Sequence, residues 1–98
     1  MIYINKYIIR PTPSFEKELQ KIYNYITFKL KEPVTAKKFY NQIAKEIYSL
    51  QYFPERHAKV PIFKNKKRNI RKLPFNQYAI IYEVDNNTRS SFYFTYIS

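Results

Sequence analysis

The stretch Arg71-Lys-Leu-Pro-Phe-Asn-Gln-Tyr-Ala-Ile-Ile-Tyr-Glu-Val84 decides the fold of this chain. It holds two runs of strand-forming residues separated by Asn76-Gln77, and a third run follows the turn-forming segment Asp85-Asn86-Asn87-Thr88. Asn tolerates the positive φ that tight turns need, so both connections fit short turns. The sequence therefore predicts an antiparallel meander whose strands are Ile70 to Phe75, Tyr78 to Val84 and Ser91 to Ile97.

Two amphipathic helices precede the meander. Thr12 is placed to cap the first helix, and Pro13 suits its first position. Glu32-Pro33 interrupts the helical pattern, and we expect Thr35 to cap the second helix. Two helices joined by so short a turn predict an antiparallel hairpin. The apolar stripes are Phe15, Leu19, Ile22, Tyr23, Ile26 and Leu30 in the first helix, and Ala36, Phe39, Tyr40, Ile43, Ile47 and Leu50 in the second.

The fold class follows from the order of these elements. Residues 2 to 10 are expected to form a first strand, because they are rich in β-branched and aromatic residues up to Arg10-Pro11. The prediction is an α+β domain of order β-α-α-β-β-β over residues 1–98, with the helical hairpin packed on one face of a mainly antiparallel sheet. We expect the third run to direct alternate residues at the helices, leaving the other face partly open. Tyr78, Ile80, Tyr82 and Val84 are expected to point to one face, and Ala79, Ile81 and Glu83 to the other.

Composition excludes several kinds of site. The chain has no cysteine, which removes disulfides, zinc–thiolate sites and thiol nucleophiles. It has no glycine either, and nucleotide-binding loops need glycine for close backbone approach to phosphates. The apolar N-terminal segment is broken by Asn5 and Lys6, and it is too short to span a bilayer. We expect no cofactor, no metal, no signal peptide, no membrane anchor and a cytoplasmic location.

The charge of +11 predicts attraction to a polyanionic or acidic partner. Much of this charge follows the second helix and continues into the meander, next to aromatic residues such as Phe63 and Phe75. Cations beside aromatic rings suit contact with nucleic acid or an acidic target, whereas the alternative is a basic surface that only keeps the domain soluble. The residues concerned are Lys64, Lys66, Lys67, Arg68, Arg71 and Lys72.

Side chains for acid–base or metal chemistry are sparse. His57 is the single histidine, and a lone histidine after Pro54 fits a surface position better than a catalytic base. Glu83 and Asp85 are the only carboxylates that lie close together at a strand end, where a solvated turn is the simpler interpretation. No spacing indicates a metal site.

The segment from Arg71 to Val84 resembles the RelE/ParE superfamily of bacterial toxins from type II toxin–antitoxin systems, which place a basic residue, a short strand, a turn and a Tyr-x-Ile-x-Tyr-x-Val strand at this position. The resemblance extends to the helix from Pro13 to Ile26 and to the helix from Ala36 to Leu50 with Phe53-Pro54-Glu55-Arg56. It covers almost the whole chain. It implies the fold already predicted and an acidic antitoxin that folds across the hairpin and the open sheet face, giving a toxin–antitoxin hetero-oligomer. Exposed aromatic residues expected to contact the antitoxin are Tyr25, Phe28 and Tyr40.

The resemblance implies two alternative targets. ParE-like members inhibit DNA gyrase, and RelE-like members cleave messenger RNA on the ribosome with Lys, Arg, Tyr or His residues. Lys72, Arg71 and Tyr78 are the candidates for such cleavage, but the arginine expected directly after Tyr78 is Ala79, and the nucleases continue with further Arg, Tyr or His positions where this sequence ends. We therefore expect a ParE-like gyrase inhibitor that arrests growth. The alternatives are a RelE-like endonuclease and a non-toxic module that binds antitoxin or regulates its own operon.

Overall fold

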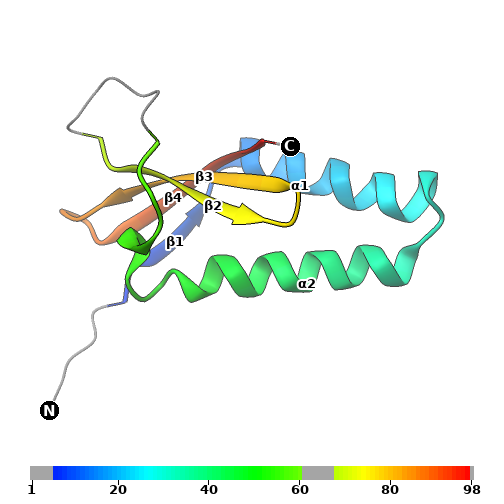
Figure 1. Ribbon diagram of the computed structural model, residues 1–98, viewed down its shortest axis with the longest axis horizontal. Coiled ribbons are helices and arrows are strands. Elements are labelled where there is room, and N and C mark those ends of the chain that lie inside the picture. The colour runs from blue at the N-terminus through cyan, green and yellow to red at the C-terminus, as the bar shows by residue number, and fades with distance from the viewer. Residues whose placement is uncertain (1–5, 61–67, 98) are drawn as a thin grey trace, which may run out of the picture.

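The computed structural model describes residues 6–60 and 68–97 (Figure 1). Its elements follow the predicted order, and the β-α-α-β-β-β architecture is confirmed. In chain order they are strand β1 (Ile8–Pro11), helix α1 (Pro13–Asn24), the π-helical turn η1 (Tyr25–Lys29), helix α2 (Pro33–Ser49), the 3-10 turn η2 (Pro54–Arg56), and strands β2 (Ile70–Phe75), β3 (Tyr78–Asp85) and β4 (Ser90–Ile97).

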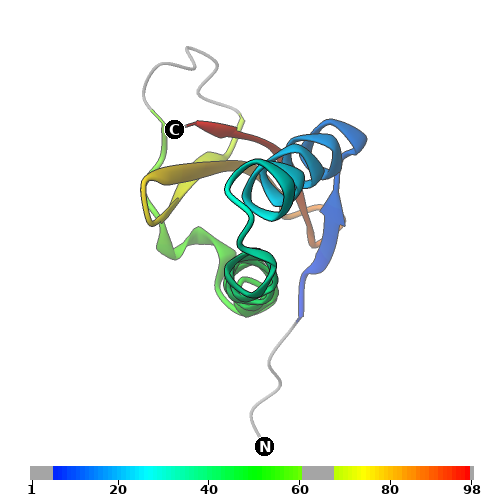
Figure 2. The same ribbon diagram turned by 90° about the vertical axis from the view of Figure 1, so that its right-hand side faces the viewer.

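The four strands form one sheet in the order β1-β4-β3-β2. Strands β2, β3 and β4 are the predicted antiparallel meander, while β1 pairs parallel with β4 at the opposite edge, with Ile8 opposite Ser90. Of the predicted first strand over residues 2 to 10, residues 2–5 lie outside the described residues, and β1 begins only at Ile8. Figure 2 looks along the helices and shows α1 and α2 next to each other on the same side of the sheet, so the predicted hairpin on one face is confirmed.

Helix α1 begins as the sequence predicts and ends differently. The Thr12 hydroxyl accepts a hydrogen bond from the Phe15 backbone N–H at 3.2 Å, and Pro13 occupies the first turn. The predicted regular helix to Leu30 changes at Tyr25 into the π-helical turn, which closes with a bond from the Leu30 N–H to the Tyr25 carbonyl at 3.1 Å.

Helix α2 starts earlier than expected. The prediction that Thr35 caps it is wrong, because the helix begins at Pro33 and its N-cap residue is Glu32, without a side-chain capping bond. Proline fits the first helical position, since its missing N–H has no intrahelical partner there. Thr35 lies inside the helix instead, and its side chain faces a hollow described below.

The hydrophobic core lies between the helices and one face of the sheet. Its buried members are Phe15, Phe39, Ile43, Ile47, Leu50, Leu73, Phe75, Ile80, Tyr82 and Val84, and Tyr78 packs against them. The predicted alternation along β3 is therefore confirmed, and the structure shows that Tyr78, Ile80, Tyr82 and Val84 are the set on the helix-facing side. The expectation that the other face of β3 is partly open fails at Ala79 and Ile81, which are also buried. On this face Ala79 is opposite Pro74 and Ile81 is opposite Lys72 in β2, so cross-strand side chains lie beside both residues.

The two meander turns use different residues for their left-handed positions. Asn76 has φ 53° in the β2–β3 turn, as expected of asparagine. In the β3–β4 turn the positive φ falls on Arg89 and not on Asn86 or Asn87. There the Asp85 carboxylate accepts a hydrogen bond from the Asn87 N–H at 2.9 Å, which closes a local turn before the left-handed residue.

Candidate functional site

Arg71, a candidate for catalysis and target contact, binds the backbone of the η2 turn. Its Nη1 donates to the backbone carbonyls of Glu55 at 2.7 Å and His57 at 2.6 Å, its Nε donates to Asn69 Oδ1 at 2.8 Å, and its Nη2 lies 3.3 Å from Glu55 Oε2. Only 12% of its side chain is exposed. The guanidinium thus fastens the η2 turn to β2, and four of its five N–H groups have partners in these contacts.

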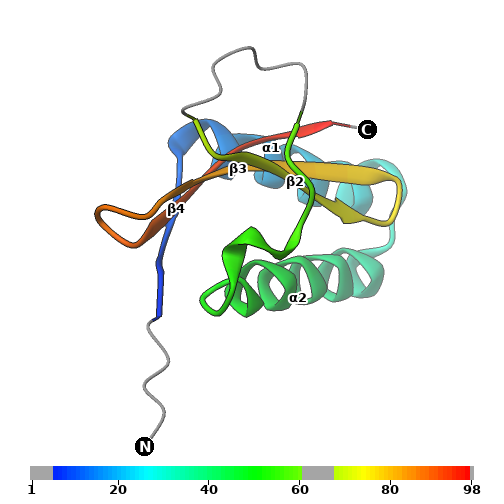
Figure 3. The same cartoon turned by 60° about the vertical axis from the view of Figure 1, so that its left-hand side comes forward.

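The η2 turn is held from two further sides. Figure 3 shows it between the end of α2 and the strands. The Tyr82 hydroxyl donates to the Pro54 carbonyl at 2.5 Å, and burial raises the pKa of Tyr82 to about 12. Arg56 donates to the Ser49 carbonyl at 3.3 Å and to its hydroxyl at 2.7 Å, so it caps the C-terminal end of α2. These contacts make η2 a rigid structural joint.

His57 ends this joint and is partly buried. Its ring meets the Tyr82 ring edge-on, with centroids 6.5 Å apart. Burial lowers the pKa of His57, and the neighbouring charge of Arg56 lowers it further. Its Nε2 is buried and has no hydrogen-bond partner among residues 6–60 and 68–97. The sequence predicted a surface position for this histidine, whereas its ring is partly buried against Tyr82, and its absence from catalysis stays a prediction.

Lys72 and Arg68 lie on the other face of the sheet. Lys72 is exposed and pairs with Ile81, whereas Arg71 pairs with Tyr82 on the helix-facing side. Arg68 forms a two-pronged ion pair with Glu83, with both N···O distances 2.9 Å, and this hydrogen-bonded pairing raises the pKa of Arg68. The other predicted contact residues, Lys64, Lys66 and Lys67, lie outside the described residues.

The structure does not bring the three nuclease candidates together. Arg71 and Tyr78 share the helix-facing side of the sheet but lie at opposite ends of the β2–β3 pair, and Lys72 lies on the reverse face. Tyr78 packs edge-on against Phe39, with ring centroids 5.7 Å apart. No cluster of three metal-ligating side chains occurs in the part of the chain that the structure describes. The catalytic roles of Arg71, Lys72 and Tyr78 stay a prediction.

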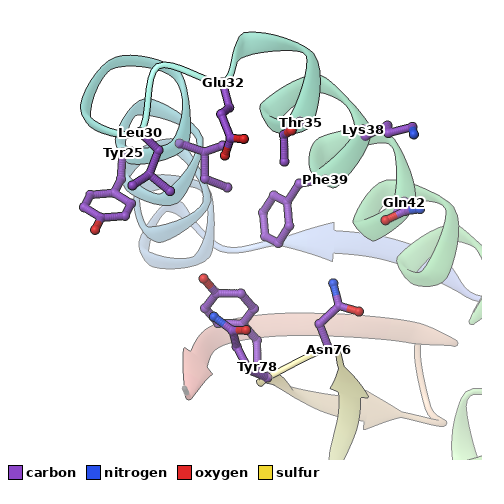
Figure 4. Close-up of a pocket in the computed structure, with 11 residues that line it drawn as sticks. Tyr25, Leu30, Glu32, Thr35, Lys38, Phe39, Gln42, Asn76 and Tyr78 are labelled. Carbon is purple, nitrogen blue, oxygen red and sulfur yellow. The ribbon is translucent and has the colours of Figure 1, made fainter.

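A hollow of about 350 Å³ lies where the hairpin turn faces the β2–β3 turn (Figure 4). Phe39 points from α2 toward Tyr78 and forms its inner wall, while Tyr25 and Leu30 border it from the hairpin turn. The remaining lining residues are Ile26, Glu32, Thr35, Lys38, Gln42, Asn76 and Gln77. This site joins segments about fifty positions apart in the sequence.

The three predicted antitoxin contacts are exposed but do not form one cluster. Tyr25 borders the hollow with 53% of its surface exposed, and Phe28 follows it in the same turn with 72% exposed. Tyr40 lies further along α2, where its ring meets the Tyr23 ring edge-on at 6.1 Å. Their contact with an antitoxin stays a prediction.

The comparisons with known proteins identify the family. The family model described as the ParE toxin of the type II toxin–antitoxin system, parDE, matches residues 9–90. The chain belongs to this ParE toxin family, within the RelE/ParE superfamily. No curated protein matches the chain. None of the helices within the described ranges is long and apolar enough to cross a membrane.

Two solved structures share the ParE-family fold. A chain of the chromosomal ParDE toxin–antitoxin system from P. aeruginosa has a TM-score of 0.73 and 17% identity, and the similarity covers 94% of this chain and 95% of that one. A chain of the RelBE2 toxin–antitoxin complex from Mycobacterium tuberculosis has a TM-score of 0.65 and 14% identity, with 97% and 93% coverage. At these identities the similarity concerns the fold.

Sequence reasoning missed both the Arg71 joint and the hollow. Consecutive residues of a strand lie on opposite faces of the sheet. The sequence could therefore have predicted that Arg71 and Lys72 lie on opposite faces. The hollow had no comparable signal, because it requires the turn at Asn76-Gln77 to face the turn after Tyr25.

Proposed function

We propose that this ParE-family protein arrests growth by inhibiting DNA gyrase and is neutralised by an acidic antitoxin. The observation that carries the choice of target is the dispersal of the candidate nuclease residues. Arg71 is bound to the η2 turn, Lys72 lies on the opposite face, and Tyr78 packs on Phe39. Family membership supports the same branch.

Phosphodiester cleavage requires a base, an acid and a charge stabiliser within reach of one phosphate. Two of the basic residues predicted to contact the target already have partners within the protein. Arg71 forms an ion pair with Glu55, and Arg68 forms one with Glu83. The partly buried histidine has a lowered pKa and lies against Tyr82. Among the described residues, these side chains are used for folding, which favours an activity based on binding over one based on cleavage.

The charge supports an acidic neutralising partner. A chain with 18 basic and 7 acidic residues attracts a polyanionic protein at long range. Exposed apolar side chains such as Tyr25 and Phe28 add surface that a partner can bury. An antitoxin segment that folds on this preformed surface would combine both contributions.

Two parallel assays test the target. Purified protein is added to a gyrase supercoiling reaction, with protein premixed with the antitoxin from its operon as the matched control. We expect inhibition at micromolar protein and recovery of supercoiling in the premixed sample. Supercoiling that is unaffected at micromolar excess would contradict the gyrase target.

The second assay maps messages in a translating extract by primer extension. We expect no new cleavage sites. New sites that disappear in a folded Lys72→Ala variant would establish the endonuclease alternative instead. Expression in a bacterium that lacks the antitoxin should stop growth, and unimpaired growth would support the non-toxic binding module.

A further inference from the structure

The hollow between the hairpin turn and the β2–β3 turn has the size and lining of a socket for one large side chain. Its volume of about 350 Å³ lies at the lower end of the range for small-ligand sites, roughly 300–1,000 Å³. Phe39 and Tyr78 meet edge-on at its base and hold its shape. We refer to this hollow as the tip pocket.

Apolar side chains at the border of the tip pocket remain exposed. Tyr25 is 53% exposed and Leu30 is 47% exposed, although both lie next to the buried ring of Phe39. Burial of these surfaces against a partner would be favourable, because it removes apolar area from water. The pocket thus combines apolar walls formed by Ile26, Phe39 and Tyr78 with an exposed apolar border.

The backbone around the tip pocket departs from regular geometry on both sides. Lys31 has φ 56° in the hairpin turn and Asn76 has φ 53° in the β2–β3 turn. The π-helical turn η1 immediately precedes Lys31, and the Glu32 N–H after it donates to the Ile26 carbonyl at 3.0 Å. Left-handed non-glycine residues and π-helical turns both concentrate at functional positions. Here these three features enclose one pocket.

The charge around the tip pocket selects the partner. The segment from Tyr25 to Gln42 carries four lysines and one acid, Glu32. Lys38 and Glu32 both line the pocket, and the Lys38 side chain points away from its interior (Figure 4), so the excess of positive charge belongs to the surrounding segment. An excess of lysine around an apolar pocket favours a partner whose apolar side chain is flanked by carboxylates. It disfavours a basic partner or a second copy of this chain.

We propose that the tip pocket receives a large apolar side chain from an acidic amphipathic segment of the antitoxin, with Lys38 and the lysines of the surrounding segment attracting the flanking carboxylates. The inference rests on the antitoxin part of the proposed function and does not depend on gyrase. The pocket would act as the anchor point of the neutralising contact, and the remaining interface would contribute less per residue.

The test measures antitoxin binding directly, by titration calorimetry with the antitoxin purified from the same operon. The variant Leu30→Glu places a carboxylate on the pocket border. Its matched control is Val34→Glu, which makes the same change of charge four residues away at a position that is 76% exposed and outside the pocket lining. Circular dichroism and a thermal melt confirm that both variants are folded.

We expect the dissociation constant to rise roughly 30-fold or more in Leu30→Glu, the size expected for an interface anchor, and less than about 3-fold in Val34→Glu. Leu30→Ala should raise the dissociation constant by less than Leu30→Glu does. Its control is Val34→Ala, which should raise it less than Leu30→Ala. Equal effects at positions 30 and 34, or no effect at 30, would overturn the inference.

Two further measurements identify the occupant. A photoreactive benzoylphenylalanine at Gln77, on the exposed β2–β3 side of the pocket, should cross-link to the antitoxin, whereas the same group at Val34 should not. Cross-linking of Gln77 to a second copy of this chain in place of the antitoxin would overturn the assignment. Lys38→Gln should weaken binding more in low salt than in high salt, and more than the control Lys45→Gln on the same helix.

Discussion

Replacing Arg71 with methionine should destabilise the protein because it releases the η2 turn from β2. Methionine keeps much of the side-chain stem and removes the guanidinium. The variant loses bonds to the Glu55 carbonyl, the His57 carbonyl and Asn69 Oδ1, which range from 2.6 to 2.8 Å. A net value of about 1 kcal/mol for each such bond gives a loss of about 3 kcal/mol in the free energy of unfolding. The exposed ion pair with Glu55 adds nothing measurable to this figure.

The assay is urea denaturation followed by circular dichroism, with an unchanged slope as the check on two-state unfolding. For a domain of this size a loss of 1 kcal/mol lowers the melting temperature by about 4–8 °C, so a fall of about 12–24 °C should accompany the change. Arg71→Lys should lose nearly as much, because an ammonium group cannot reproduce the planar fork that reaches several acceptors at once.

The matched control is Lys72→Met, which removes the next cation along β2. Lys72 is exposed on the opposite face, so its free energy of unfolding should stay within about 0.5 kcal/mol of the parent protein. Should Arg71→Met also remain within 0.5 kcal/mol, the structural role assigned to Arg71 would be refuted. Its guanidinium would then be available for target contact.

Two further predictions concern single buried groups. The pKa of His57 is lowered in the folded protein below its ordinary value of 6.5, so the unfolded chain binds the proton more readily. The free energy of unfolding should therefore fall as pH drops below about 6.5. In His57→Gln, urea unfolding between pH 7 and 5 should depend less on pH. The same pH dependence in the variant and the parent protein would contradict this role of His57. The Thr27 hydroxyl is buried without a hydrogen-bond partner in the described part of the chain. Thr27→Val should raise the free energy of unfolding by about 1 kcal/mol, and a loss of stability on thermal or urea unfolding would indicate an unseen partner.

Local patterns were enough to predict most of the fold. The spacing of apolar residues such as Phe39, Ile43 and Ile47 identified the helix α2, and the alternation from Tyr78 to Val84 separated the two faces of β3. The cap at Thr12 and the left-handed Asn76 were also confirmed. These features depend on neighbours within a few residues, where backbone geometry and amphipathicity leave few choices.

The candidate site was predicted less well, because its chemistry depends on partners distant in sequence. Sequence placed Arg71 among basic residues that contact a target, but the structure shows a guanidinium bound to carbonyls about fifteen positions earlier. A cation's role is set by the acceptors that folding brings to it, and nothing near Arg71 in the sequence indicated them.

By itself, the sequence determined the order of the elements, the helical hairpin, the meander and the membership of a toxin superfamily. Only the tertiary structure decided that Arg71, Lys72 and Tyr78 do not converge, and that the turn after Tyr25 faces Asn76 across a pocket. The reason is physical. Helix and strand periodicity is encoded residue by residue, whereas the meeting of two turns is fixed by how the hairpin packs on the sheet through Phe39, Phe75 and Tyr78.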